Sequence, residues 1–222
     1  QPAPGDFRRQ YQFLASHFAD VLSINLTGKA SGTLEAARSA AERVNAHGRI
    51  HVINSLNASL GQGLLAVAAA EMIEYGQMYM AQIVKNSQAL GKALDERGIP
   101  MLGAEKGYSQ THQVIANVKQ FGGGLEVAHR LAEANIITNK NLIPGDGPED
   151  WDRPSGLRIG TIEITRLGMR EADMSIIADF IARVLVKGES TESVGKDVID
   201  YRLPKQDFYY CFDNGLPPWA NQ

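Results

Sequence analysis

The spacing of apolar positions predicts alternating helices and strands in the first third of the chain. The predicted elements are a helix over residues 7–18 with Asp6 as its N-cap, a strand over 21–26, an Ala-rich helix over 34–46, a strand over 51–54 and a helix from Leu60. This strand–helix–strand order favours parallel strands joined by a right-handed crossover.

The pattern of the remaining chain predicts a different arrangement, a small domain in which helices pack on a sheet. Residues 60–97 are compatible with a helix almost throughout, either as one long helix or as two that meet at a bend near Gly76. The elements predicted after it are strands over 98–102, 113–118 and 136–138, a helix over 125–134, a polar loop over 139–152, a strand carrying Arg158 and a helix opened by residues 170–173. We therefore expect an α/β fold class, in which a short parallel βαβ segment precedes a small α+β domain with a mostly antiparallel sheet.

Composition narrows the class of protein without naming a function. With 222 residues, 44% hydrophobic and 21% charged, the chain is typical of one large or two small globular domains. A net charge of −3 gives no reason to expect nucleic acid or an anionic membrane as a partner. No apolar run approaches the roughly 20 residues that cross a bilayer. Cys211 stands alone, so no internal disulfide is expected and a cytoplasmic location follows; the start at Gln1 rather than Met suggests a cut or processed chain.

One arginine lies inside a short apolar strand. Arg158 stands between Leu157 and Ile159, after a Pro-Ser-Gly turn. Its charge must be solvated, paired or directed at an anion, because an unpaired buried charge is too costly. A guanidinium also holds a carboxylate through two parallel hydrogen bonds. The residues alone leave an internal salt bridge and a ligand carboxylate as alternatives.

Small polar turns follow the two predicted parallel strands. Residues 27–33 and 55–59 place free N–H groups at helix starts, which favour anions, at the sheet edge where ligands bind in parallel sheets. Ser31 and Thr33 are also ordinary N-cap residues, and capping is the alternative interpretation.

Spaced motifs in this first part resemble the DegV family of fatty-acid-binding proteins. They are Gln1-Pro2-Ala3-Pro4-Gly5-Asp6-Phe7, Leu22-Ser23-Ile24-Asn25-Leu26-Thr27, Ala30-Ser31-Gly32-Thr33, Val52-Ile53-Asn54-Ser55 and Ala58-Ser59-Leu60-Gly61-Gln62-Gly63. The resemblance implies lipid binding at Ser31, Gly32 and Thr33, with Ser31 holding the fatty-acid carboxylate. Asn54 stands where the family usually has Asp, and Thr27-Gly28 where it often has Ser-Ser. The family's second lobe, which closes over the acyl chain, has no counterpart after residue 75.

The second part resembles the small C-terminal domain of serine hydroxymethyltransferase, especially of the archaeal type. The motifs are Gln82-Ile83-Val84-Lys85-Asn86, His112-Gln113-Val114, Ala134-Asn135-Ile136-Ile137, Asn139-Lys140-Asn141, Ser155-Gly156-Leu157-Arg158-Ile159-Gly160-Thr161, Thr165-Arg166-Leu167-Gly168-Met169 and Tyr210-Cys211-Phe212-Asp213-Asn214-Gly215-Leu216-Pro217. The resemblance implies that Arg158 binds the α-carboxylate of serine or glycine, with pyridoxal phosphate and tetrahydrofolate as the family's cofactors. The Schiff-base lysine belongs to that family's large domain, and its Thr-Thr-Thr-His-Lys motif is absent from this sequence.

The other candidates for chemistry favour structural interpretations. We expect Lys140 to be structural or solvent-exposed, and His112 to be structural rather than a base. No cluster has metal-ligand spacing, and the acidic loop with Asp146, Glu149, Asp150 and Asp152 is predicted to be solvated. Gly122-Gly123-Gly124 lacks a Walker lysine, so it predicts a turn at a helix start rather than a phosphate loop.

The sequence thus predicts a chimera-like chain with a junction over residues 71–79. Residues 1–75 form the DegV-like segment and residues 76–222 the domain similar to serine hydroxymethyltransferase. The expected function is that of an incomplete or engineered combination that is not catalytic alone and binds a small carboxylate, an amino acid or a fatty acid. One alternative is a part of an active transferase of one-carbon metabolism, which converts serine to glycine with its large domain supplied elsewhere. Another is a fatty-acid-binding protein. The sequence is compatible with a homo-oligomer, and the oligomeric state stays open.

Overall fold

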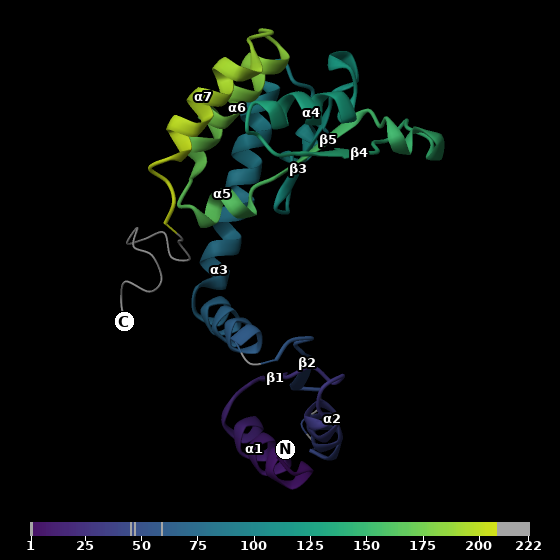
Figure 1. Ribbon diagram of the computed structural model, residues 1–222, viewed down its shortest axis with the longest axis vertical. Helices are drawn as coiled ribbons and strands as arrows, with labels where there is room; N and C mark the ends of the chain where they lie inside the picture. The colour runs from purple at the N-terminus through teal and green to yellow at the C-terminus, as the bar shows by residue number, and fades with distance from the viewer. Residues whose placement is uncertain (1, 45, 47, 59, 208–222) are drawn as a thin grey trace. The chain divides into compact units, whose positions relative to one another are not determined.

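The computed structural model describes residues 2–44, 46, 48–58 and 60–207. The aromatic tail with Cys211, which belongs to the resemblance above, lies outside the described residues, as does Gln1. The chain divides into two compact units, Gln1–Glu74 and Tyr75–Gln222, and each has its own sheet (Figure 1). Helix α3, Leu60–Asp95, is one helix of 36 residues, which decides between the two alternatives for this stretch. The mixed α/β class is confirmed, with a parallel pair of strands in the first unit and a three-stranded antiparallel sheet in the second.

The first unit is a βαβ crossover with an extra helix. Its elements are α1 Pro4–His17, β1 Val21–Asn25, α2 Thr33–Arg43 and β2 Ile50–Asn54, followed by the start of α3. β1 and β2 pair in parallel from Val21 with Ile50 to Asn25 with Asn54. The apolar sides of α1 and α2 pack with the sheet around Tyr11, whose hydroxyl donates to Ser23 Oγ at 2.6 Å. The alternation of the strands therefore directs one face to this small core.

The prediction that Asp6 is the N-cap of the first helix was wrong, because Asp6 lies inside the first turn of that helix. α1 begins at Pro4, which suits a first helical position because that position needs no N–H donor. The Asp6 carboxylate accepts a hydrogen bond from Ala3 N at 3.1 Å and pairs with Arg9 at 2.6 Å. These contacts, Arg9 first, lower the pKa of Asp6. Asp6, at the third helical position, thus stabilises the start of α1 through its side chain.

The second unit packs helices against one face of a sheet in the strand order β3-β5-β4. Its elements after α3 are the short 3₁₀ turn Ala104–Lys106, β3 Gln113–Asn117, the 3₁₀ turn Lys119–Phe121, α4 Gly124–Glu133, β4 Asn139–Asn141, the 3₁₀ turn Pro148–Asp152, β5 Gly156–Gly160, α5 Ile162–Arg166, α6 Glu171–Leu185 and α7 Thr191–Arg202. The core includes Leu90, Leu94, Val114, Val127, Leu131, Leu157, Met174, Ile181 and Val184. The central position of β5 fixes where its side chains point, since the strand pairs on both edges.

Two predicted strands of the second unit were wrong. Residues 98–102 form only an isolated bridge, from Met101 to Ala116, and Ile99 N bonds back to Leu94 O as the chain leaves α3. Residues 136–138 continue the end of α4, because Ile136 N donates to Leu131 O, and the strand follows them within the predicted polar loop. A short loop segment that packs into the core is apolar because it is buried. Its sequence pattern therefore resembles that of a short strand.

Two helices were not predicted. Helix α5 is too short to show a period. Helix α7 lies in a charged segment, where Ser190 accepts a hydrogen bond from Ser193 N at 3.1 Å as its N-cap and Val194 is buried. Among the described residues, no helix combines the length and apolar character needed to span a bilayer.

Candidate functional site

Arg158 occupies the middle of β5 and points away from the core. Its neighbours Leu157 and Ile159 are 1% and 6% exposed, whereas Arg158 is exposed. Successive side chains of a strand alternate between the two faces, so the apolar neighbours direct the guanidinium to the outer face. Ile115 of β3 and Asn139 of β4 are its register partners across the sheet. A rigid central strand therefore carries the predicted carboxylate-binding residue.

Two glycines allow the turn before Arg158 to pack closely. A Cβ on Gly156 would lie 2.3 Å from Ile143 Cγ2 and 2.6 Å from Asn141 O. A Cβ on Gly124 would lie 2.1 Å from Gly156 O. No real Cβ tolerates such distances, so α4 and β4 can approach β5 only where side chains are absent. This packing gives a physical reason for the glycine in the Ser-Gly-Leu-Arg run.

Asp146 ties the loop to the start of β5. One of its carboxylate oxygens accepts hydrogen bonds from Ile143 N at 3.0 Å and from Ser155 N at 2.9 Å. The Ser155 side chain first, and then these backbone donors, lower the pKa of Asp146. Asp150 similarly accepts from Gly147 N at 2.8 Å. These two carboxylates of the acidic loop therefore also hold the backbone of the loop in place.

A small cavity of about 170 Å³ lies beside Arg158. It is lined by Lys140, Asn141, Leu142, Trp151, Pro154 and Arg158. Lys140 Nζ donates to Trp151 O at 3.0 Å and to Asp152 O at 3.1 Å, so this lysine, which also lines the cavity, holds the loop. Within the described part of the chain, Arg158 has no carboxylate or hydrogen-bond partner. The internal salt bridge that the sequence left open is therefore not formed there.

A buried polar network behind β5 was missed by the sequence reasoning. Asn86 Nδ2 on α3 donates to Thr165 Oγ1 and to Met169 O, both at 2.8 Å. Thr165 Oγ1 donates to Thr161 O at 2.6 Å, and Thr161 Oγ1 lies 3.1 Å from Ile83 O. Asn86, Thr161 and Thr165 are fully buried. The one signal available was a polar residue at a core-facing position of an otherwise apolar helix face.

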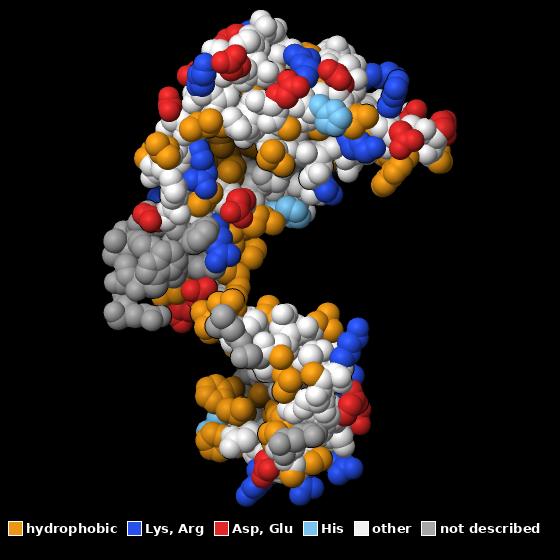
Figure 2. Space-filling model, in the orientation of Figure 1, with side chains coloured by type: hydrophobic (Ala, Val, Ile, Leu, Met, Phe, Trp, Pro, Cys, Tyr) orange, Lys and Arg blue, Asp and Glu red, His pale blue; other side chains and the backbone are white. Residues whose placement is uncertain are grey.

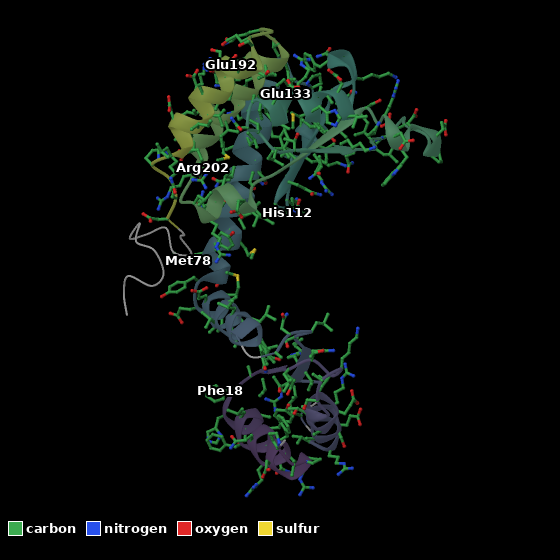
Figure 3. All side chains as sticks on the ribbon, viewed as in Figure 1. Phe18, Met78, His112, Glu133, Glu192 and Arg202 are labelled. Carbon is green, nitrogen blue, oxygen red and sulfur yellow. The ribbon has the colours of Figure 1, made fainter. Side chains whose placement is uncertain are left out.

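His112 contributes to this network through its backbone. Its carbonyl oxygen accepts from Thr161 N at 2.8 Å and from Thr161 Oγ1 at 3.0 Å, while its side chain is exposed (Figure 3). This contact joins the end of β5 to the residue before β3, in a structural role.

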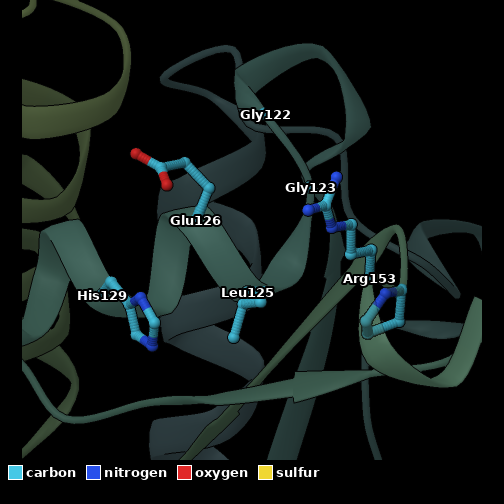
Figure 4. A pocket seen from close by; sticks show the side chains of 7 residues that line it. Gly122, Gly123, Leu125, Glu126, His129 and Arg153 are labelled. Atoms are coloured by element: carbon cyan, nitrogen blue, oxygen red, sulfur yellow. The ribbon is translucent and has the colours of Figure 1, made fainter.

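The glycine run 122–124 forms a turn at the start of α4. Gly123 N donates to Val118 O at 3.1 Å and Gly124 N to Pro154 O at 2.7 Å, so the protein itself uses these donors. Gly122 and Gly123 have φ of 108° and 85°, which favours glycine. Figure 4 shows the adjoining cavity of about 330 Å³, with Glu126 and His129 on α4 and Arg153 across from them. The glycines thus shape the helix start.

In the first unit the Ser31-Gly32-Thr33 turn lies at the carboxyl edge of the sheet. Ser31 Oγ lies 2.7 Å from Thr33 Oγ1 and accepts from Thr33 N at 3.2 Å. Gly32, rather than Ser31 or Thr33, is the N-cap residue of α2. Thr27 N donates to Asn57 O at 2.8 Å, which brings the turns after β1 and β2 together. The geometry joins the predicted lipid-binding residues in one turn whose hydroxyls bond to each other.

No group of three or more His, Cys, Asp or Glu side chains that could hold a metal ion occurs within the described ranges. Arg158 on one sheet and the Ser31 turn beside the other are the candidate ligand contacts that the motifs and the geometry share, whereas Lys140 joins Arg158 through the geometry alone.

Comparison with known proteins separates the chain into two parts. The sequence model of the DegV family, described as an uncharacterised protein family, matches residues 1–95. Serine hydroxymethyltransferase of Methanocella arvoryzae is 50% identical over 149 residues, which are 67% of this chain and 35% of the enzyme. The Pyrococcus furiosus enzyme is 51% identical over 153 residues, 68% of this chain and 36% of the enzyme.

A solved structure supports the same relationship. The crystal structure of L-threonine transaldolase from Pseudomonas fluorescens in its internal aldimine state matches with a TM-score of 0.59 and 30% identity, over 73% of this chain and 37% of that protein. The chain spans about a third of the length of the curated relatives it matches. It therefore combines a segment matched by the DegV family with a segment about half identical to the serine hydroxymethyltransferases, the two-part organisation that the motifs predicted.

Proposed function

We propose that the second unit binds the carboxylate of a small amino acid, serine or glycine, through Arg158, and that this chain alone is not catalytic. The exposed, unpartnered guanidinium on the central strand carries the proposal. The identity to serine hydroxymethyltransferases supports an amino acid as the ligand. Residues 1–74 contribute no contact to this site in the proposal.

The charges around the cavity favour an anion. Arg158 and Lys140 both line it, and its lining contains no acidic side chain. A guanidinium can hold a carboxylate through two parallel hydrogen bonds, and a β-strand keeps it in place better than a loop does. Lys140 adds a second positive charge, although its hydrogen bonds to two carbonyl oxygens hold it to the loop. Together the two cations would stabilise a ligand with one acid group.

The same residues do not make a site for pyridoxal phosphate, the cofactor of the related enzymes. That cofactor requires a lysine for the Schiff base and an acid beside the pyridinium nitrogen. The lysine of this cavity is engaged by Trp151 O and Asp152 O, and no carboxylate accompanies it. No reaction step through this cofactor, or through tetrahydrofolate, is therefore assigned to the chain.

Titration of glycine and serine into matched variants tests the proposal. We expect Arg158→Ala to weaken binding at least tenfold, because hydrogen bonds to charged groups contribute roughly 1.5–3 kcal/mol. Arg158→Lys should give an intermediate loss, since it keeps the charge but not the fork. Arg153→Ala, an exposed arginine of the neighbouring cavity, is the control and should bind normally. Unchanged glycine and serine binding by Arg158→Ala would discard the role of Arg158.

The competing proposal is that the chain is one part of an active hydroxymethyltransferase. It is favoured because the match covers 35% of the related enzyme, as expected for a part of it. Adding pyridoxal phosphate and recording the absorption spectrum separates the two proposals. A Schiff-base band, or conversion of serine to glycine by this chain with pyridoxal phosphate and tetrahydrofolate supplied, would support the enzyme and contradict the non-catalytic proposal.

A second binding function, for a fatty acid, is favoured by the DegV match over residues 1–95. In this proposal the Ser31 hydroxyl holds the acyl carboxylate at the start of α2. Native mass spectrometry should detect copurified lipid, and Ser31→Ala should lose it. Ser16→Ala, at an exposed serine on α1 that bonds to Phe13 O, is the matched control. Equal lipid retention by both variants would rule out the Ser31 role.

A further inference from the structure

A second cavity, of about 350 Å³, lies on the other face of β5 from Arg158. Its lining includes Ile159 of β5, Glu163 of α5, Phe180 of α6, and Tyr201 and Arg202 of α7. Ile159 is buried on the side of the helices, whereas Arg158 is exposed on the opposite side. The two cavities are therefore separate sites on one strand.

The walls of this cavity are mostly aliphatic and aromatic. Ile164 and Leu167 come from α5 and its end, Ile177 and Phe180 from α6, and Val198 from α7. Figure 2 shows hydrophobic side chains gathered on this face of the second unit, with acidic and basic side chains close by. A cavity of several hundred Å³ with apolar walls and a few polar groups is typical of small-molecule sites. Its walls favour an apolar ligand group of moderate size, since burial contributes about 0.8 kcal/mol per CH₂.

One acid and one base accompany these apolar walls. Glu163 lies on α5, and its carboxylate is not paired with any described residue. Arg202 ends α7 and is half-buried, and its guanidinium donates to Lys205 O, which leaves further N–H donors free. No ion pair joins Glu163 and Arg202, so their charges remain separate at the same cavity.

Two other polar side chains of the lining, Tyr201 and Asn135, already have partners within the protein. The Tyr201 hydroxyl donates to Asp173 Oδ1, and burial of the hydroxyl, followed by this contact with a carboxylate, raises the pKa of Tyr201. Asn135 Nδ2 donates to Gly195 O at 3.3 Å. Glu163 and Arg202 are thus the charged groups left for a ligand, one of each sign.

We propose that this cavity binds a free α-amino acid with an apolar side chain, such as leucine or phenylalanine. The ligand carboxylate meets Arg202, the ammonium group meets Glu163, and the side chain packs against Phe180 and its aliphatic neighbours. A ligand carrying both charges satisfies both residues, whereas a simple fatty acid or amine leaves one of them without a partner. The site is independent of the carboxylate site proposed at Arg158.

Three related probes test the three contacts with the full chain. L-Phenylalanine carries both charges, 3-phenylpropionate lacks the ammonium group, and 2-phenylethylamine lacks the carboxylate. In calorimetric or NMR titrations we expect each truncated probe to bind about tenfold more weakly than L-phenylalanine, which corresponds to about 1.4 kcal/mol. Equal affinities for all three probes, or no binding of L-phenylalanine, would overturn the proposal.

Charge-removing variants assign each contact to a residue. Glu163→Gln should remove the preference for L-phenylalanine over 3-phenylpropionate, and Arg202→Met the preference over 2-phenylethylamine. Glu192→Gln is the control for removal of an acid, because Glu192 pairs with Lys196 at 2.9 Å elsewhere on α7 (Figure 3). Preferences that persist in Glu163→Gln and Arg202→Met would refute the assignment.

The Arg158→Ala variant distinguishes this site from the first. We expect it to bind L-phenylalanine as the unaltered chain does, since Arg158 does not line this cavity. Loss of L-phenylalanine binding in Arg158→Ala would place the ligand at the first site and contradict a second one. Failure of glycine and serine to bind anywhere would affect only the Arg158 proposal.

Discussion

Replacing Asn86 by alanine should destabilise the second unit by an amount that the structure allows us to estimate. Asn86 is 0% exposed, and its amide donates to Thr165 Oγ1 and Met169 O at 2.8 Å each. The alanine leaves two buried acceptors without these donors. A buried polar group without a partner costs about 1–3 kcal/mol.

The free-energy cost of losing the Asn86 donor differs between the two acceptors. Thr165 Oγ1 keeps its donated bond to Thr161 O at 2.6 Å, so its loss lies at the low end of that range. Met169 O lies at the end of the α5 turn and has no second donor among the described residues. Adding the small cavity left by the removed amide, we expect Asn86→Ala to cost about 3 kcal/mol.

Urea unfolding combined with hydrogen exchange measures this cost. Faster exchange of the β5 amides should accompany the lower midpoint, because the network holds the chain that follows β5. Gln88→Ala is the matched control: its side chain, on the same helix, donates to Ser109 O at 2.9 Å from an exposed position and should cost less than about 1 kcal/mol. A loss below about 0.5 kcal/mol for Asn86→Ala, or one equal to that of Gln88→Ala, would refute the reasoning.

Three further changes test the packing around the site. Gly156→Ala should cost about 3 kcal/mol in urea unfolding and expose the β4 amides to exchange, whereas Gly160→Ala on the same strand, with no atom near its added Cβ, should cost far less. Asp146 has a folded pKa below its unfolded value, so its contribution is complete above about pH 4 and is lost as the pH falls through the folded pKa. Acid titration of Asp146→Asn should lack that step. Thr138→Val should be neutral or stabilise by up to about 1 kcal/mol in thermal unfolding, because the buried Thr138 hydroxyl has no partner among the described residues; a clear loss would contradict this.

The position of the predicted site on its strand followed from local pattern. Leu157, Arg158 and Ile159 alternate, and any strand with two buried apolar neighbours must turn the residue between them outward. Whether Arg158 is paired with a carboxylate did not follow from the local pattern. Whether a carboxylate lay opposite it depended on β4 and the loop before β5, which the sequence places only as a polar segment. The second cavity was also not predicted, since its walls come from α5, α6 and α7, two of which the pattern did not show.

The sequence by itself determined the two-part organisation, the parallel strands of the first unit, the long helix-compatible stretch and the outward direction of Arg158. These features depend on periodicity, turn residues and motifs, which act over a few neighbouring positions. Only the tertiary structure decided the pairing of β4 with β5, the bonds from Asn86 to Thr165 across 79 positions, and the separation of Glu163 and Arg202 at one cavity. Such contacts join residues distant in the chain, and their partners are selected by the shape and unsatisfied donors of the packed core rather than by local sequence.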